Sequence, residues 1–241
     1  MDMGAIHPAR AALLVGLLTA GVIFWTSPIV YPLKLLAVMG HETGHAVAAL
    51  LVGGSVDRVS LRADESGQCL SRIPDGFVAK TVVYSAGYVG SAIIAVLLLV
   101  LTYRFNARRW MLGLACVWLG LMGLFYARDA FTLAFCVVVG AAFGAGARWL
   151  PAGAVGALNL FIATFTALYS VMDLKDDLWN QAIRAQSDAQ LLANVTIVPA
   201  IVWAVTWTVV SGAVLLAGIA MALKEPRPRN RGTTLRAPIE T

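Results

Sequence analysis

Long apolar runs, each close to the length of a membrane span, alternate with short polar segments along most of the chain. The runs cover residues 11–31, 33–52, 78–103, 110–126, 130–147, 155–172 and 199–223. A helix needs about 20 consecutive apolar residues to cross the hydrocarbon core of a bilayer. The pattern therefore predicts an all-α polytopic membrane protein with about seven transmembrane helices, six being the alternative count.

The polar segment between residues 55 and 76 departs from the helical pattern. Its apolar residues Val56, Val59 and Leu61 are interleaved with polar ones, and residues 64–68 have the composition of a turn. Apolar and polar residues that alternate beside a turn are typical of a β-hairpin. We predict a short β-hairpin directly after the second apolar run; a plain extramembrane loop is the alternative.

The composition supports a membrane protein without a soluble domain. The 241 residues are 59% hydrophobic and only 13% charged, whereas about a quarter of the residues in an average soluble domain are charged. We predict one membrane-embedded domain over residues 1–223 and a basic, disordered tail over residues 224–241. Positive charge concentrated in a tail beside a span favours the cytoplasm or anionic lipid, so nucleic acid is not an expected partner.

The second apolar run contains His41-Glu42-Thr43-Gly44-His45. Two histidines four residues apart on a helix point the same way, and both can reach one metal ion. Glu42 lies on the adjoining arc, where it can act on a bound water. Because ionisable side chains are costly in lipid unless a metal, a cavity or partners compensate them, the motif predicts a metal site within the membrane.

A catalytic zinc usually has three protein ligands and an open position. The remaining histidine, His7, lies outside the apolar runs, whereas Asp173, Asp176 and Asp177 directly follow the sixth run with spacing i, i+3, i+4. Such spacing places them on one face of a continuing helix. Asp173, the deepest of the three, is the predicted third ligand, and Asp177 is the less favoured candidate. For Asp176 and Asp177, a simple marker of the membrane exit is the alternative interpretation.

Two histidines, a carboxylate and an open position favour Zn²⁺ over other divalent ions. Zinc lowers the pKa of a bound water and polarises a peptide carbonyl. Glu42 is then the general base that takes the proton of the water and delivers it to the leaving amine. Glu42 is therefore predicted to be catalytic and not a ligand.

Several motifs together resemble those of the site-2 protease family. They are the His-Glu-x-Gly-His motif in a membrane span, the Gly-Gly turn and hairpin after it, and the Ser85-Ala86-Gly87-Tyr88 opening of the next span. The similarity is greatest to the short bacterial branch without a PDZ or CBS domain. In that branch an Asp-containing motif ends a later span, as Asp173 does here. The Ser187-Asp188-Ala189 stretch, followed by tryptophans at 203 and 207, is also similar.

One motif departs from the pattern of the better-known members. They have Leu-Asp-Gly preceded by Asn-x-x-Pro, whereas here Leu174 and Lys175 follow Asp173. The departure concerns the third ligand and leaves the histidine motif intact.

The resemblance implies an intramembrane zinc metalloprotease, with zinc on His41, His45 and Asp173 and catalysis by Glu42. Its substrate would be a membrane protein or peptide, and it would be a multi-pass protein of a bacterial cell membrane. The resemblance also gives the hairpin a role. Its exposed strand edge, with Val56, Val59 and Leu61, would pair with an unwound substrate segment by β-addition, since the carbonyls of an intact membrane helix are already hydrogen-bonded.

Two other functions remain open. The first is a membrane protein that binds a metal or a partner without cleaving peptides, although an intact Glu42 argues against it because a structural zinc needs no base. The second is a transporter with a path lined by the same polar residues. Inverted repeats would favour a transporter, and we find none in the sequence. The oligomeric state is left open.

Overall fold

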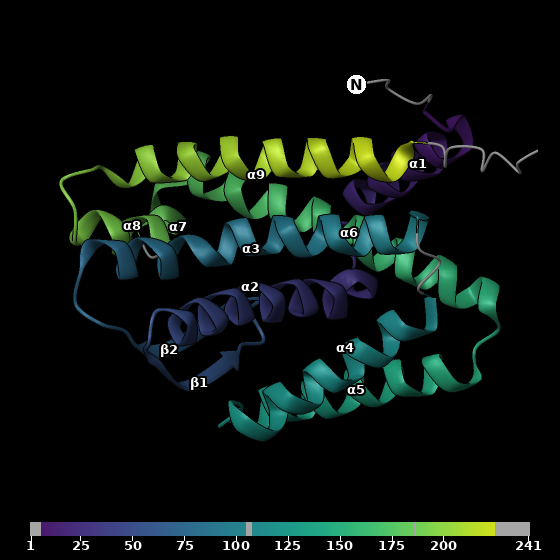
Figure 1. The fold of residues 1–241 in the computed structure, drawn as a ribbon, viewed down its shortest axis with the longest axis horizontal. Coiled ribbons are helices and arrows are strands. Elements are labelled where there is room, and N and C mark those ends of the chain that lie inside the picture. Colours follow the sequence, from purple (N-terminus) through teal and green to yellow (C-terminus); the bar gives the residue numbers. More distant parts are fainter. Residues whose placement is uncertain (1–5, 105–107, 186, 225–241) are drawn as a thin grey trace, which may run out of the picture.

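The computed structural model describes residues 6–104, 108–185 and 187–224, and these form a helical bundle with a small hairpin at one end (Figure 1). The elements in chain order are α1 (Pro8–Ile23), the 3-10 helix η1 (Pro28–Val30), α2 (Tyr31–Leu51), β1 (Ser55–Leu61), β2 (Gly67–Arg72), α3 (Phe77–Arg104), α4 (Arg108–Phe125), α5 (Ala130–Trp149), α6 (Ala152–Trp179), α7 (Gln181–Arg184), α8 (Asp188–Asn194) and α9 (Ala200–Leu223).

The predicted fold class, an all-α membrane protein with a short β-hairpin, is confirmed. In the described part of the chain, α3, α5, α6 and α9 are each long and apolar enough to cross a membrane. The helices α1 and α2 pass the same test together as a bent pair, and α4 is a shorter apolar helix. These helices correspond one to one to the seven predicted apolar runs.

The bend between α1 and α2 measures 116°. Proline at positions 28 and 32 accounts for a break here, because proline lacks the N–H that a continuing helix would use. The two ends of the described chain meet. Ile6 pairs with Lys224, and the His7 N–H donates to the Leu223 carbonyl at 2.9 Å. The start of α1 and the end of α9 therefore lie together, at the opposite end of the bundle from the hairpin (Figure 1).

The hairpin is antiparallel, with Val59 opposite Cys69 and Leu61 opposite Gly67. The outer edge of β1 is covered by the loop between α4 and α5 and by the start of α5. The Val59 N–H donates to the Tyr126 carbonyl at 3.0 Å, and the Leu61 N–H donates to the Thr132 hydroxyl at 2.8 Å. The hairpin is thus part of the bundle and not a loose appendage.

The turn of the hairpin is tied to the start of α2. The ammonium of Lys34, buried on α2, lies 2.9 Å from the Glu65 carboxylate and 4.8 Å from the centre of the Trp25 ring. The Tyr31 hydroxyl donates to the Ala63 carbonyl at 3.0 Å. An unpaired buried ammonium is costly, so the ion pair and the aromatic ring together account for a lysine at this position. These contacts hold the hairpin close to the helix that carries the histidine motif.

The predicted tail lies almost wholly outside the described residues, which end at 224. Its disorder, and the division into a domain and a tail, stay predictions.

Candidate metal centre

The helix α2 presents His41, Glu42 and His45 inside the bundle. All three residues are buried, and the two imidazole rings lie with their centroids 4.8 Å apart. Their spacing of four residues gives slightly more than one helical turn, so both rings emerge on the same side. The face that they share looks toward α3, α8 and the end of α6.

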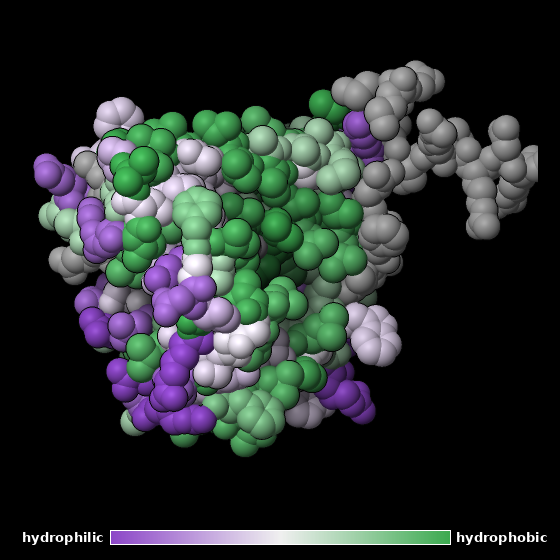
Figure 2. All heavy atoms as spheres, turned by 60° about the vertical axis from the view of Figure 1, so that its left-hand side comes forward, coloured by the Kyte–Doolittle hydropathy of each residue, from purple (hydrophilic) through white to green (hydrophobic). Residues whose placement is uncertain are grey.

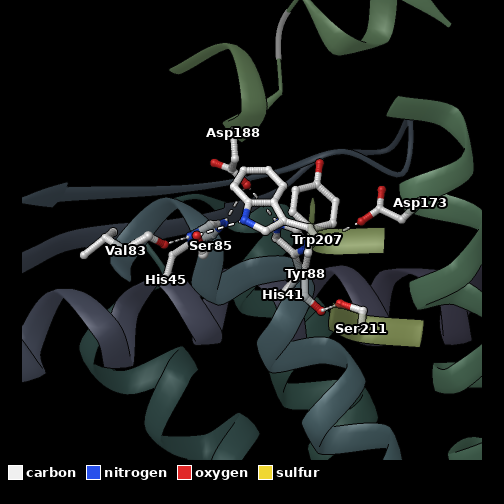
Figure 3. A network of polar contacts seen from close by, with 9 residues as sticks. All are labelled: His41, His45, Val83, Ser85, Tyr88, Asp173, Asp188, Trp207 and Ser211. Carbon is white, nitrogen blue, oxygen red and sulfur yellow. Dashed lines mark hydrogen bonds and ion pairs between the residues drawn. The ribbon is translucent and has the colours of Figure 1, made fainter. Parts of the chain in front are cut away.

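In each of the two imidazoles, the ring nitrogen that faces away from the other histidine has a polar partner. The Nδ1 of His45 donates to the Val83 carbonyl of α3 at 2.7 Å, which leaves its Nε2 as the nitrogen with a free lone pair. The Nδ1 of His41 lies 3.5 Å from a carboxylate oxygen of Asp173 on α6 (Figure 3). Metal-binding histidines are commonly oriented in this way by a carbonyl or carboxylate on the other nitrogen.

Both Nε2 atoms face one carboxylate, that of Asp188 at the start of α8. The Oδ2 of Asp188 lies 3.3 Å from Nε2 of His41 and 3.0 Å from Nε2 of His45. The three residues offer ligand atoms within 4.8 Å of one another, so the group could hold a metal ion. Burial opposes ionisation of Asp188, but the two histidines outweigh it and hold the pKa of the carboxyl below its ordinary value. A carboxyl group binds a metal in its deprotonated form, so a carboxylate facing the two Nε2 atoms suits a metal site.

Packing of α8 explains how a residue so distant in the sequence reaches the histidines. The chain leaves α6, passes through the short α7 and turns back over the end of the bundle (Figure 1). Ala189 and Leu192 of α8 are fully buried against Tyr88, Leu174 and Trp207. This apolar cluster fixes α8 and so fixes the position of Asp188.

The structure therefore differs from the sequence-based expectation for the third ligand. Asp173, the predicted ligand, is brought to the same histidine pair, but it meets the Nδ1 side of His41 and not the side where the two Nε2 atoms converge. Asp176 forms an ion pair with Lys175 at 2.9 Å, and the side chain of Asp177 lies outside the described part of the structure. Asp188 carried no periodic signal. Its only signal in the sequence was the resemblance of the Ser-Asp-Ala stretch.

Two glycines of α3 and α2 make room for this arrangement. A Cβ on Gly87 would lie 2.2 Å from Nε2 of His41 and 2.5 Å from Nε2 of His45. A Cβ on Gly44 would lie 2.4 Å from the carbonyl oxygen of Ala86. Gly44 thus lets the backbones of α2 and α3 touch, and Gly87 leaves free space beside both Nε2 atoms. Two imidazole nitrogens, a carboxylate and this space fit the requirements of a bound metal ion.

Aromatic side chains wall the site on the α3 and α9 side. The Tyr88 ring meets His41 edge-on at 4.8 Å and stacks on Trp207 at 5.0 Å. The Trp207 indole donates to the Ser85 hydroxyl at 2.9 Å, and the Ser211 hydroxyl donates to the Tyr88 carbonyl at 3.5 Å (Figure 3). These contacts restrict the ring of His41 and exclude bulk water from one side of the site.

Glu42 faces the hairpin. A Cβ on Gly67 of β2 would lie 2.7 Å from Oε1 of Glu42 and 2.5 Å from Cγ1 of Val38. The backbone of Cys69, two residues further along β2, hydrogen-bonds to the Glu42 carboxylate. The second strand of the hairpin thus lies directly against the residue expected to act as the base.

The structure does not bring the predicted substrate-binding residues of β1 to the site. Val59 and Leu61 are fully buried in the core between α2 and the α4–α5 pair, and Val56 packs against the same core. Their strand has its outer edge covered by the segment that includes Tyr126. The strand that reaches Glu42 is β2.

A comparison with known protein families identifies the chain. The family model of the Peptidase M50B-like proteins matches residues 14–218, which is most of the sequence. The protein belongs to the peptidase M50B-like family. This confirms the resemblance to the site-2 proteases, and it makes the protein a membrane metalloprotease by family and an integral membrane protein. Comparisons with curated proteins and with solved structures gave no match.

Proposed function

We propose that the protein is an intramembrane zinc metallopeptidase of a bacterial cell membrane. It hydrolyses peptide bonds in or near the transmembrane segments of a membrane protein or peptide. The observation that carries the proposal is the buried group of His41, His45 and Asp188 beside Glu42, inside a bundle of membrane-spanning helices. Family membership supports the reaction type.

The proposed zinc ligands are Nε2 of His41, Nε2 of His45 and the carboxylate of Asp188. We propose Asp188 in place of Asp173 because both Nε2 atoms converge on it. Asp173 then acts through His41: it accepts the Nδ1 proton and turns Nε2 toward the ligand position. A zinc ion held there would supply an activated water and polarise the scissile carbonyl.

The chain's own contribution to the chemistry comes from Glu42. Its position next to His41 on α2 places its carboxylate on the arc adjoining the ligand face, and the Cys69 backbone holds it there. Glu42 takes a proton from the attacking water and passes it to the nitrogen of the leaving amine. No other acid on α2 is available for this role, since Glu42 is the only Asp or Glu between residues 31 and 51.

The edge of β2 supplies a place for the substrate backbone. The N–H groups of Val59 and Leu61 point away from β2, so these residues and their partners Cys69 and Gly67 form non-hydrogen-bonded pairs. The backbone N–H and C=O groups of Gly67 and Cys69 therefore point outward, on the side of Glu42. An unwound substrate segment that pairs with this edge would lie beside the base.

The role of the edge is tested with Cys69→Pro and Cys69→Ala. Proline removes the outward N–H of Cys69, a change that an edge strand tolerates. Because this N–H also donates to Glu42, the variant tests substrate pairing and the hold on the base together, whereas alanine removes only the thiol. We expect Cys69→Pro to reduce cleavage while zinc content is unchanged, and Cys69→Ala to cleave like the wild type. Equal cleavage by both variants would remove the edge from the proposal.

The proposed function is tested by zinc analysis and cleavage of a model transmembrane substrate, both on the purified chain in liposomes. The wild type should contain zinc and cleave. Glu42→Gln should contain the same zinc and lose cleavage, because the amide cannot accept the proton. A Glu42→Gln protein that still cleaves contradicts the role of Glu42. A zinc-loaded wild type that cleaves no membrane substrate favours the alternative of a non-proteolytic metal-binding protein.

A further inference from the structure

A pocket with three arginines lies at the hairpin end of the bundle, where hydrophilic residues gather (Figure 2). Its volume is about 320 Å³, and it is lined by Arg58, Ser60, Leu61, Arg62, Gln68, Arg128 and Asp129. Arg58 and Ser60 alternate along β1 and so share one face of the strand, and Arg62 directly follows the last residue of β1. Arg128 comes from the loop between α4 and α5. The pocket thus joins two segments that are far apart in the sequence.

The carboxylate of Asp129, which lines the pocket, already accepts hydrogen bonds from Thr132. The two oxygens of Asp129 accept from the backbone N–H and the hydroxyl of Thr132, each at 2.8 Å, and so cap the start of α5. Asp64 lies near Arg62, but its carboxylate accepts the Ser66 hydroxyl at 2.6 Å and the Ser66 N–H at 3.1 Å.

The arginines keep donors for a ligand. The Arg128 guanidinium donates to the carbonyl of Phe125, the last residue of α4, and to that of Ala127 in the loop after it, which fixes its direction. Within the described residues, no ion pair is found for Arg58 or Arg62. Three guanidinium groups around one occupied carboxylate leave the pocket positive. Arginine forks match the oxygens of a phosphate group.

The surface beside the pocket is apolar. Leu124 and Phe125, at the end of α4, are 71% and 54% exposed, and Phe131 at the start of α5 is 39% exposed. The backbone contact between Arg128 and Phe125 joins this apolar surface directly to the pocket. A ligand that fits both parts has an anionic group at the membrane edge and an apolar body along α4 and α5.

We propose that the pocket binds the phosphate of an anionic phospholipid whose acyl chains lie on α4 and α5. The exposed apolar flank favours a lipid over an acidic peptide or a free anion, since neither of these has an acyl chain to cover it. The lipid site holds the α4–α5 loop against β1, the strand whose edge that loop covers. The inference does not depend on the proposed proteolysis, because its test measures lipid binding.

The test is binding of phosphatidylglycerol and phosphatidylcholine to the purified full-length chain in detergent, measured by native mass spectrometry. We expect phosphatidylglycerol to be retained in preference. The double variant Arg58→Gln, Arg62→Gln should weaken its binding roughly thirtyfold, since each surface arginine contributes about a fivefold factor to attraction of anionic lipid. Arg72→Gln is the matched control. Arg72 is an exposed arginine on the same hairpin, but it pairs with Asp57 at 3.1 Å and does not line the pocket.

Three results would overturn the proposal. They are equal retention of the two lipids, a double variant that binds phosphatidylglycerol like the wild type, and equal displacement of the lipid by inorganic phosphate or an acidic peptide at matched concentration. A second measurement needs no variant: phosphatidylglycerol binding to the wild type should weaken as salt is raised, and binding that is independent of salt contradicts an electrostatic site. Thermal unfolding in phosphatidylcholine alone checks that the double variant is folded.

Discussion

The end of α6 and the start of α8 each bring one carboxylate to the same pair of histidines, by different means. Asp173 stands on a long apolar helix, α6, and the packing of α6 against α2 brings it to the Nδ1 side of His41. Asp188 stands on a helix of seven residues, and only the packing of Ala189 and Leu192 carries it to the two Nε2 atoms. The carboxylate with the clearer sequence signal is therefore not the one on which the two Nε2 atoms converge.

The largest effect should come from Asp188→Asn. An amide is a poor replacement for an anionic ligand, so we expect the purified variant to lose stoichiometric zinc while its helical circular dichroism is retained. Metal analysis after dialysis against a weak chelator measures the effect. If Asp188→Asn keeps its zinc and Asp173→Asn loses it, the comparison is reversed and Asp173 is the ligand.

Gly87→Ala tests on which side of the histidines the metal lies. The added methyl would meet both Nε2 atoms, so we expect zinc to be lost although every polar side chain is kept. Gly90→Ala is the control, because a Cβ there would come no nearer than 3.7 Å to the Gly44 backbone. Zinc content of the two variants gives the readout. Full zinc in Gly87→Ala would place the metal away from the Nε2 side.

Asp173→Asn should have an intermediate effect. Loss of a carboxylate that orients a ligating histidine typically weakens metal binding about 10- to 100-fold. Competition with a chelator measures the affinity, and the visible spectrum of the Co²⁺-substituted protein reports the ligand set. We expect a weaker affinity with an unchanged spectrum. A changed coordination spectrum would show that Asp173 binds the metal directly.

The smallest effect should come from Asp176→Asn. Asp176 pairs with Lys175 at a half-exposed position, and such surface ion pairs contribute roughly 0–1 kcal/mol. We expect unchanged zinc content and a free energy of unfolding within about 0.5 kcal/mol of the wild type, measured by denaturant titration. Loss of zinc would extend the functional part of the acidic cluster beyond Asp173.

The hairpin also combines a feature that the local sequence predicted with one that only packing decided. Alternation of apolar residues predicted the hairpin correctly, but β2 begins at Gly67, inside the segment 64–68 that the composition marked as the turn. The same alternation could not say which of the two strands lies beside Glu42. The apolar residues Val59 and Leu61 form the core side of β1, and the α4–α5 segment closes its edge. The strand beside Glu42 is β2, whose small residue Gly67 allows the close approach.

The sequence by itself determined the class of the protein and indicated the histidine pair on which the candidate site is built. Apolar runs of membrane length follow from the need to satisfy backbone hydrogen bonds within lipid, and the spacing of His41 and His45 follows from the pitch of a helix. Both are local relations, so they can be read along the chain. Only the tertiary structure decided the third member of the group, the strand of the hairpin that lies beside Glu42 and the arginine pocket. Each of these joins segments separated by tens of residues, and their meeting depends on how helices pack, which no local periodicity records.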